Sequence, residues 1–363
     1  VPRPGGERPR DPWRCGMVVE AFTIEALLAG VAGGVLGAAI GGLPALSLAG
    51  FVIVVGEAAN ALLRAVGAQT LANPAGLSGV GITETIGLGP TLGPHVAFAG
   101  GVAAAAYAGR HGTLDDAFPY HPAKDVRTPL GSSPDVLLAG GLFGLLGVLL
   151  ARVAAGWSLP VDPVAFAVVL SAVGHRVAFG YPLLGRVDGS LLDLTPFEHG
   201  ERRGGIGAAD PAESSGRFAV EPWQPHHYDW VGVTILGAAV GAIAGYVGLA
   251  TGSAFLAFGL AAASLVFLAL GVDRFPVTHH MALPASIVAL GLAGQPAWLG
   301  VLAGGVFGVL GGLLGEFGER VLYAHADTHL DPSFLSILLT SVVLAGLATV
   351  GVLDPAAIPY PVP

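Results

Sequence analysis

GLFGLLGVLL at residues 141–150 returns as GVFGVLGGLL at residues 305–314. Both segments combine large apolar side chains with glycines three residues apart, a spacing that keeps one face of a helix small. The whole chain is 53% hydrophobic and only 11% charged, whereas about 25% of the residues of a soluble domain are charged. Mean hydropathy is +0.72. The sequence therefore predicts an integral membrane protein.

Ten segments approach the length of about 20 mostly apolar residues that a spanning helix needs. The third and eighth are short, and the eighth contains Pro284, so either could instead be a half-helix or a re-entrant segment. We expect an all-α, polytopic transmembrane bundle of about ten helices, with spans near 21–43, 45–66, 92–109, 135–156, 162–180, 229–250, 252–271, 277–294, 297–318 and 333–352.

Further matches repeat in the same order as the opening pair. LGAAIG at 36–41 returns as LGAAVG at 236–241, PHVAF at 94–98 as HHMAL at 279–283, and an Asp-Pro pair at 162–163 as one at 331–332. Such order predicts a duplication. Because each half has five spans, an odd number, the second half would enter the membrane from the opposite face, as an inverted repeat.

These matches predict the organisation of the chain. Residues 17–180 would form the first transmembrane repeat, 181–228 a linker loop, 229–353 the second repeat and 354–363 a short tail. Residues 1–16 are rich in Pro, Gly and Arg and have no apolar core, so they are not a secretory signal. We interpret them as a disordered or spurious leader before a true start at Met17.

Basic residues predict the orientation. In a ten-span arrangement, the loops after spans three, five, seven and nine share one side, and apart from the leader the other side has only Arg64 and Arg152. The positive-inside rule places the linker in the cytoplasm and both termini outside the plasma membrane. The basic residues of the linker side are Arg110, Lys124, Arg127, Arg186, Arg202, Arg203, Arg217, Arg274 and Arg320.

Ionisable groups within spans are costly in lipid and are therefore candidates for a transport path. Glu57 is the one acid deep in an early span, and Asn60 lies three residues on, on the same helix face. A proton or cation site is one interpretation. The alternative is a structural hydrogen bond, or an ion pair with Arg176.

His95 and His280 occupy matching positions in the two halves, and His279 replaces His280 if the register differs by one. Near the midplane, paired imidazoles could line a path for a polar solute or relay protons. The alternative is two histidines at helix starts, bonded to backbone carbonyls.

His175 lies nine residues after a Phe, as do Asn60 and Ser264, which suggests a shared polar layer. The adjacent Arg176 is a secondary candidate, and snorkelling to the headgroups explains it more simply.

Several classes of function are disfavoured. No basic patch indicates nucleic acid, and no Walker A, dinucleotide-binding, serine-elbow or HExxH motif occurs. His325 and His329 have an i, i+4 spacing that can bind a metal, but they lie in a polar loop without an evident third ligand. We therefore expect no catalytic residues, no metal and no cofactor.

The five-plus-five arrangement is similar to that of urea channels, ammonium channels and several secondary transporters. The chain as a whole resembles uncharacterised multi-pass membrane proteins of salt-adapted archaea. The inferred repeats, the matching buried polar positions and the lack of a loop long enough for an enzyme domain predict a lipid-embedded transporter or channel for a small polar solute or ion, compatible with a homo-oligomer. The buried acid Glu57 favours coupling to protons or cations.

Two alternatives stay open. One is an intramembrane enzyme on a lipid-linked substrate, for which the best cluster is Tyr120, His121, Lys124, Asp125 and Arg127. The other is a non-transporting partner in a membrane assembly.

Overall fold

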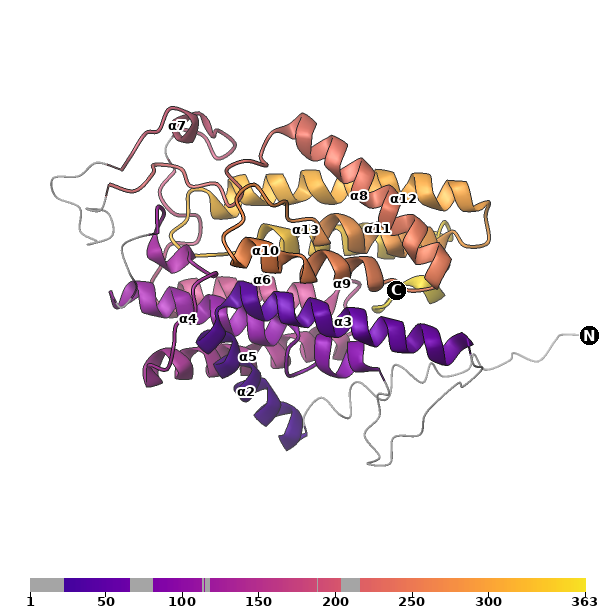
Figure 1. Ribbon diagram of the computed structural model, residues 1–363, viewed down its shortest axis with the longest axis horizontal. Coiled ribbons are helices and arrows are strands. Elements are labelled where there is room, and N and C mark those ends of the chain that lie inside the picture. The colour runs from indigo at the N-terminus through magenta and orange to yellow at the C-terminus, as the bar shows by residue number, and fades with distance from the viewer. Residues whose placement is uncertain (1–22, 66–80, 113, 115–117, 188, 204–215) are drawn as a thin grey trace, which may run out of the picture.

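The computed structural model describes residues 23–65, 81–112, 114, 118–187, 189–203 and 216–363. Across these ranges the chain is helical and has no strand. The predicted leader and Met17 lie outside the described residues. Figure 1 shows the early helices (indigo to magenta) on one side of the molecule and the late helices (orange to yellow) on the other.

A helix overlaps each of the ten predicted spans. The first half, residues 24–178, contains α2 (Ile24–Ile40), α3 (Gly42–Ala65), the π-helical turn η3 (Pro94–Phe98) leading into α4 (Ala99–Arg110), α5 (Pro134–Gly156) and α6 (Pro163–Ala178). The second half, residues 230–349, contains α8 (Trp230–Thr251), α9 (Leu256–Ala263) and α10 (Leu265–Ala269), α11 (His279–Gly291), α12 (Ala297–Gly318) and α13 (Pro332–Thr349).

Among the described residues, five helical stretches are long and apolar enough to cross a membrane: 42–62, 134–156, 230–251, 297–323 and 332–349. Their outward surfaces present large apolar side chains, such as Val55, Leu142 and Leu302. Exposed side chains of this kind along a whole helix are suited to lipid rather than water. The chain is therefore a helical membrane protein.

α4 and α11 are shorter than a membrane is thick. At 1.5 Å per residue, the 13 residues of α11 extend about 20 Å, against about 30 Å of hydrocarbon. Ahead of α4, the Thr91 carbonyl lies against Gly33 in the middle of α2, so the preceding segment reaches well into the bundle without forming a long helix. The third and eighth segments thus match the half-helix alternative.

Glycines produce the closest helix pairs of each half. A Cβ added at Gly34 of α2 would lie only 2.2 Å from the carbonyl oxygen of Gly140 in α5. In the same way, a Cβ added at Gly241 of α8 would lie 2.2 Å from the carbonyl oxygen of Gly304 in α12. Backbones can approach this closely only where side chains are missing.

The half-helices pack alike as well. Gly147 of α5 lies directly on the backbone carbonyl of His95, and Gly311 of α12 lies on that of His280. These contacts agree with the predicted match of His95 to His280. They do not agree with the LGAAIG match, because Gly37 of that motif packs on Ala97 whereas Gly237 packs on α12.

The halves meet along two antiparallel helix pairs. Gly50 of α3 lies against the backbone of Ala263 in α9, and Gly259 of α9 lies against Ile53 of α3. Because the later residue of α3 contacts the earlier residue of α9, the two helices run antiparallel.

α6 and α13 form the second pair. The Asp162 amide, at the start of α6, donates to Ser341 Oγ, well inside α13 (2.9 Å). At the other end of α6, Arg176 bonds to Thr328, just before α13 begins. Each helix starts at an Asp-Pro pair whose carboxylate caps the first turn, Asp162 on Ala165 and Asp331 on Phe334.

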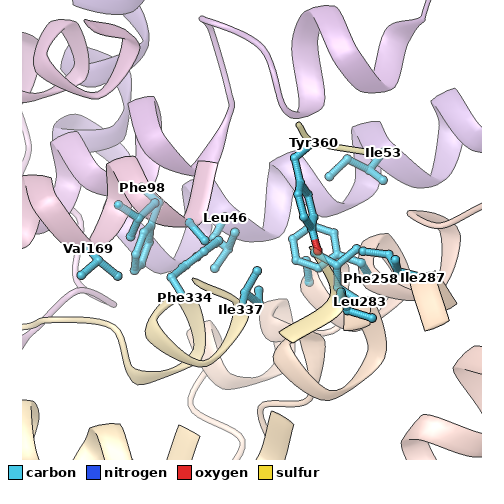
Figure 2. Close-up of a cluster of buried hydrophobic side chains, with 14 of the residues drawn as sticks. Leu46, Ile53, Phe98, Val169, Phe258, Leu283, Ile287, Phe334, Ile337 and Tyr360 are labelled. Atoms are coloured by element: carbon cyan, nitrogen blue, oxygen red, sulfur yellow. The ribbon is translucent and has the colours of Figure 1, made fainter. Parts of the chain in front are cut away.

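The space between the halves is filled with apolar side chains (Figure 2). Phe98 and Phe334, one from each half, have ring centroids 5.7 Å apart. The cluster also includes Leu46, Ile53, Val169, Phe258, Leu283, Ile287 and Ile337, and Tyr360 of the tail packs into it. The centre of the molecule is therefore packed and apolar.

Candidate functional site

Glu57 is 4% exposed and accepts three hydrogen bonds. Its Oε1 accepts from Thr83 Oγ1 (2.8 Å) and Asn60 Nδ2 (3.2 Å), and its Oε2 accepts from Ser253 Oγ (2.6 Å). Gly56 makes room for Thr83, whose hydroxyl would lie 2.4 Å from a Cβ there. Glu57 and Asn60 thus contact each other as predicted, and Glu57 joins α3 to the turn that links α8 and α9 in the second half.

His95 and His280 are both buried but lie in separate surroundings. His95 packs on Gly147, about 20 Å along α5 from its start, and His280 packs on Gly311, about 20 Å along α12 from its start. These two helices start at opposite ends of the bundle. The histidines therefore lie at mirrored depths, each inside its own half.

His175 and Arg176 meet the second half together. His175 Nε2 lies 2.9 Å from Thr328 Oγ1, and Arg176 Nε donates to the same hydroxyl at 2.9 Å. Arg176 also donates to the carbonyls of Leu183, Leu322 and Thr328. Arg176 is 1% exposed, so the snorkelling interpretation is wrong. Its guanidinium is satisfied by carbonyl oxygens and not by Glu57.

Ser264 donates to the Ala261 carbonyl of its own helix segment (2.7 Å). Asn60 bonds to Glu57 and His175 to Thr328, so the three members of the suggested polar layer have three different sets of partners. Counting from Phe landmarks therefore does not group these side chains.

The linker, predicted only as a loop, packs onto the end of the bundle where α8 and α11 begin; we call this the linker end (Figure 1). Its Glu221 is fully buried and forms an ion pair with Lys124 of the loop before α5, with Nζ and Oε2 2.8 Å apart. Lys124 Nζ also lies 4.4 Å from the centroid of the Tyr323 ring. Burial lowers the pKa of Lys124 to about 8, although Glu221 opposes the shift.

Asp327 organises a second part of this network. It pairs with Arg217 and, at 3.5 Å, with Arg203, both from the linker. Burial alone would raise the pKa of Asp327, but the two arginines lower it. Of the residues considered for an intramembrane enzyme, Tyr120, His121 and Lys124 are buried beneath the linker, which suits them to holding the loops together.

A small pocket of about 20 Å³, room for about one water molecule, lies at the linker end and has both polar and apolar lining residues. Its lining includes the carboxylates Glu316 and Glu319 and the imidazoles His227 and His280. Glu316 is paired with Arg320 at 2.6 Å. Burial lowers the pKa of His227. Sequence reasoning missed Glu316 and Glu319, although two acids three residues apart at the end of an apolar helix were a usable signal.

Next to the pocket lies a row of buried histidines. His279 and His280 have ring centroids 5.8 Å apart, and His329 Nε2 lies 3.2 Å from Asp331 Oδ2. Asp331 also acts electrostatically on His279 and His280. Across the described ranges, no group of three or more His, Cys, Asp and Glu residues has the geometry of a metal site.

These features define a helical membrane protein with buried ionisable groups between tightly packed helices. The chain belongs to a protein family described as a family of unknown function (DUF7973), which it matches over residues 17–361. Neither the curated proteins nor the solved structures include a significant match to it.

Proposed function

We propose that the protein is a carrier for a small polar solute or ion in the plasma membrane, built from two inverted five-segment repeats. The linker would lie in the cytoplasm and both termini outside, in agreement with the basic residues of the linker side. The observation that supports this most directly is the antiparallel pairing of matching helices, α3 with α9 and α6 with α13. A pseudo-two-fold axis in the membrane plane produces this pairing.

The half-helices support the same proposal. Inverted-repeat transporters bind their substrates beside discontinuous helices near the middle of the membrane. Here α4 and α11 are the matching short helices, each preceded or begun by a buried histidine, and each lies on a glycine of the neighbouring long helix.

A carrier fits better than a channel because the space between the halves is filled. A polar solute would have to cross the cluster that contains Phe98, Phe334 and Leu46 (Figure 2). Movement of the halves against each other would open this cluster on one side at a time, which is the basis of alternating access.

The topology can be tested with single cysteines. In a Cys15→Ser background, His199→Cys places a thiol on the exposed linker and Gly294→Cys places one in the turn before α12. In intact cells a membrane-impermeant maleimide should label position 294 and leave 199 unlabelled until the cells are lysed. Labelling of both from outside would contradict the inverted arrangement.

Transport itself calls for purified protein in liposomes. Currents on a solid-supported membrane, recorded after jumps in concentration of small inorganic ions, amino acids and organic acids, should reveal at least one solute that protein-free liposomes ignore. A protein that is silent to the whole panel and copurifies with a second membrane protein would instead favour the assembly role.

A further inference from the structure

We propose that the tail, residues 354–363, is a strap that holds the two halves together at the end of the bundle opposite the linker, and that Tyr360 is its contact with the seam between them. We call this end, where α6 begins and α11 and α13 finish, the tail end. The inference rests on the carrier proposal and adds the element that closes its outer side. The halves separate on that side only when Tyr360 leaves the seam.

The tail is anchored on the second half. The Asp354 amide donates to the Gly291 carbonyl at the end of α11 (2.9 Å). Leu353, just before the tail, packs against the same glycine, where an added Cβ would lie 3.1 Å from the Leu353 Cβ. The Asp354 carboxylate then caps the short 3-10 turn η7 (Pro355–Ala357) through the Ala356 amide. The root of the tail is therefore fixed to α11, and the residues after the turn run on from there.

Tyr360 reaches the place where the start of α6 meets α13. Its hydroxyl donates to the Ser341 carbonyl in α13 (3.2 Å). The Ser341 hydroxyl accepts from the Asp162 amide at the start of α6 (2.9 Å). Burial, and after it the Asp162 carboxylate, raise the pKa of the Tyr360 hydroxyl, so this carboxylate of the first half lies near it. Ser341 thus joins the tail, α13 of the second half and α6 of the first half at one point.

The Tyr360 ring covers the apolar cluster between the halves at the tail end (Figure 2). Tyr360 is 6% exposed, although the preceding Pro359 is exposed. The ring lines a hollow together with Asp162 of α6 and with Leu283 and Ile287 of α11, and this hollow has no room for a water molecule. Such a contact excludes water from the seam, which the closed side of an alternating-access carrier requires.

The linker closes the opposite end with charges instead. Glu221 of the linker pairs with Lys124 of the first half, and Arg217 of the linker pairs with Asp327 of the second half. Breaking a buried ion pair leaves uncompensated charges, which is costly, whereas withdrawing the uncharged Tyr360 leaves none. The tail end is therefore the easier of the two ends to release.

Double electron–electron resonance can measure the separation of the halves at each end in the full chain, reconstituted in nanodiscs with Cys15→Ser. Trp157→Cys and Gly294→Cys place spin labels in the exposed turns after α5 and after α11, at the tail end. Ser132→Cys and Asp273→Cys place them in the exposed turns before α5 and before α11, at the linker end. Each pair contains one label in each half.

Tyr360→Ala should raise the population of a longer distance at the tail end several-fold, because the minor state of a two-state protein is populated at about 0.1–10% and the strap no longer disfavours it. The linker-end pair should keep its distance. Tyr360→Phe keeps the ring and loses the bond to Ser341, so its effect should be smaller. Val352→Ala, at a side chain 55% exposed just before the tail, is the matched control and should change neither distance.

The outcomes separate the strap from the carrier. Unchanged tail-end distances in Tyr360→Ala would overturn the strap, even if a solute moves in the liposome assay. Equal broadening at both ends would mean a general loosening of the fold and would overturn it as well. A longer distance at the tail end alone supports the strap even if no solute moves, and the carrier proposal then fails on its own assay.

Discussion

Arg176 and Thr328 form a buried polar link between the halves. The guanidinium Nε donates to the threonine hydroxyl at 2.9 Å, and His175 Nε2 lies 2.9 Å from the same oxygen. The side chains of all three residues are buried. One hydroxyl therefore serves an imidazole and a cation that both come from α6.

Thr328→Val should destabilise the protein because it keeps the shape and removes this oxygen. We expect a loss of about 2–3 kcal/mol, since a buried charged donor then lacks one partner. Thermal unfolding in detergent, followed by tryptophan fluorescence, measures it. Thr234→Val is the matched control, because the Thr234 hydroxyl bonds only to its own helix, at the Trp230 carbonyl. Equal melting temperatures for the two variants would contradict the link.

Lys124 should make stability increase with pH in the mildly alkaline range. Its pKa is about 8 in the folded protein and 10.5 in an unfolded chain, so between these values the unfolded chain binds more protons. The free energy of unfolding must then increase with pH, by about 1–2 kcal/mol between pH 8 and 9.5. Below about pH 8 both states are protonated and the cost of burying the charge is fully present.

The melting temperature of the natural protein minus that of Lys124→Met isolates this contribution. The difference should increase from pH 7.5 to 9.5, because the methionine variant lacks the titrating group. A difference that stays constant or decreases would show that Lys124 does not titrate as a buried base.

Gly308→Ala should be poorly tolerated. A Cβ there would lie 2.1 Å from the Gly237 carbonyl oxygen, and both groups belong to helix backbones that cannot turn aside. Gly346→Ala in α13 is the control, since a Cβ at that position meets nothing within 4 Å, and alanine favours helix by up to about 1 kcal/mol. We expect folded yield in detergent to fall several-fold for position 308 and to hold or improve for position 346.

Much of the helix pattern could be predicted because hydropathy and glycine spacing are local signals. The contact between Glu57 and Asn60 was predictable for the same reason, since i and i+3 share a helix face. Contacts between residues far apart in the sequence could not be predicted. Lys124 could be seen as a lone lysine in a loop, but nothing in one sequence indicates that Glu221 lies opposite it.

The register of the repeats shows where pattern matching fails. LGAAIG and LGAAVG match letter for letter at five positions, yet the glycines that pack alike are Gly34 and Gly241, which do not match in that alignment. Small residues are so common in these helices that identity is weak evidence, whereas a close backbone contact fixes one register. Glu316 and Glu319 were overlooked because they follow the glycine-rich run of α12.

Substitutions at Glu57 distinguish a structural role, in which its carboxylate acts as a clamp between the halves, from a role in proton coupling. As a clamp, it holds Thr83 and Ser253 together, so Glu57→Gln and Ser253→Ala should both lower thermal stability, each by about 1–3 kcal/mol. Ser264→Ala is the control, because that hydroxyl bonds within its own helix segment.

If Glu57 is instead a coupling group, Glu57→Gln alone would abolish the pH dependence of uptake in liposomes, and Ser253→Ala would leave it unchanged. The three hydrogen bonds to one buried carboxylate favour the clamp, so we expect pH-dependent uptake to survive Glu57→Gln in whatever protein remains folded. Loss of that dependence at full stability would instead assign the coupling role to Glu57.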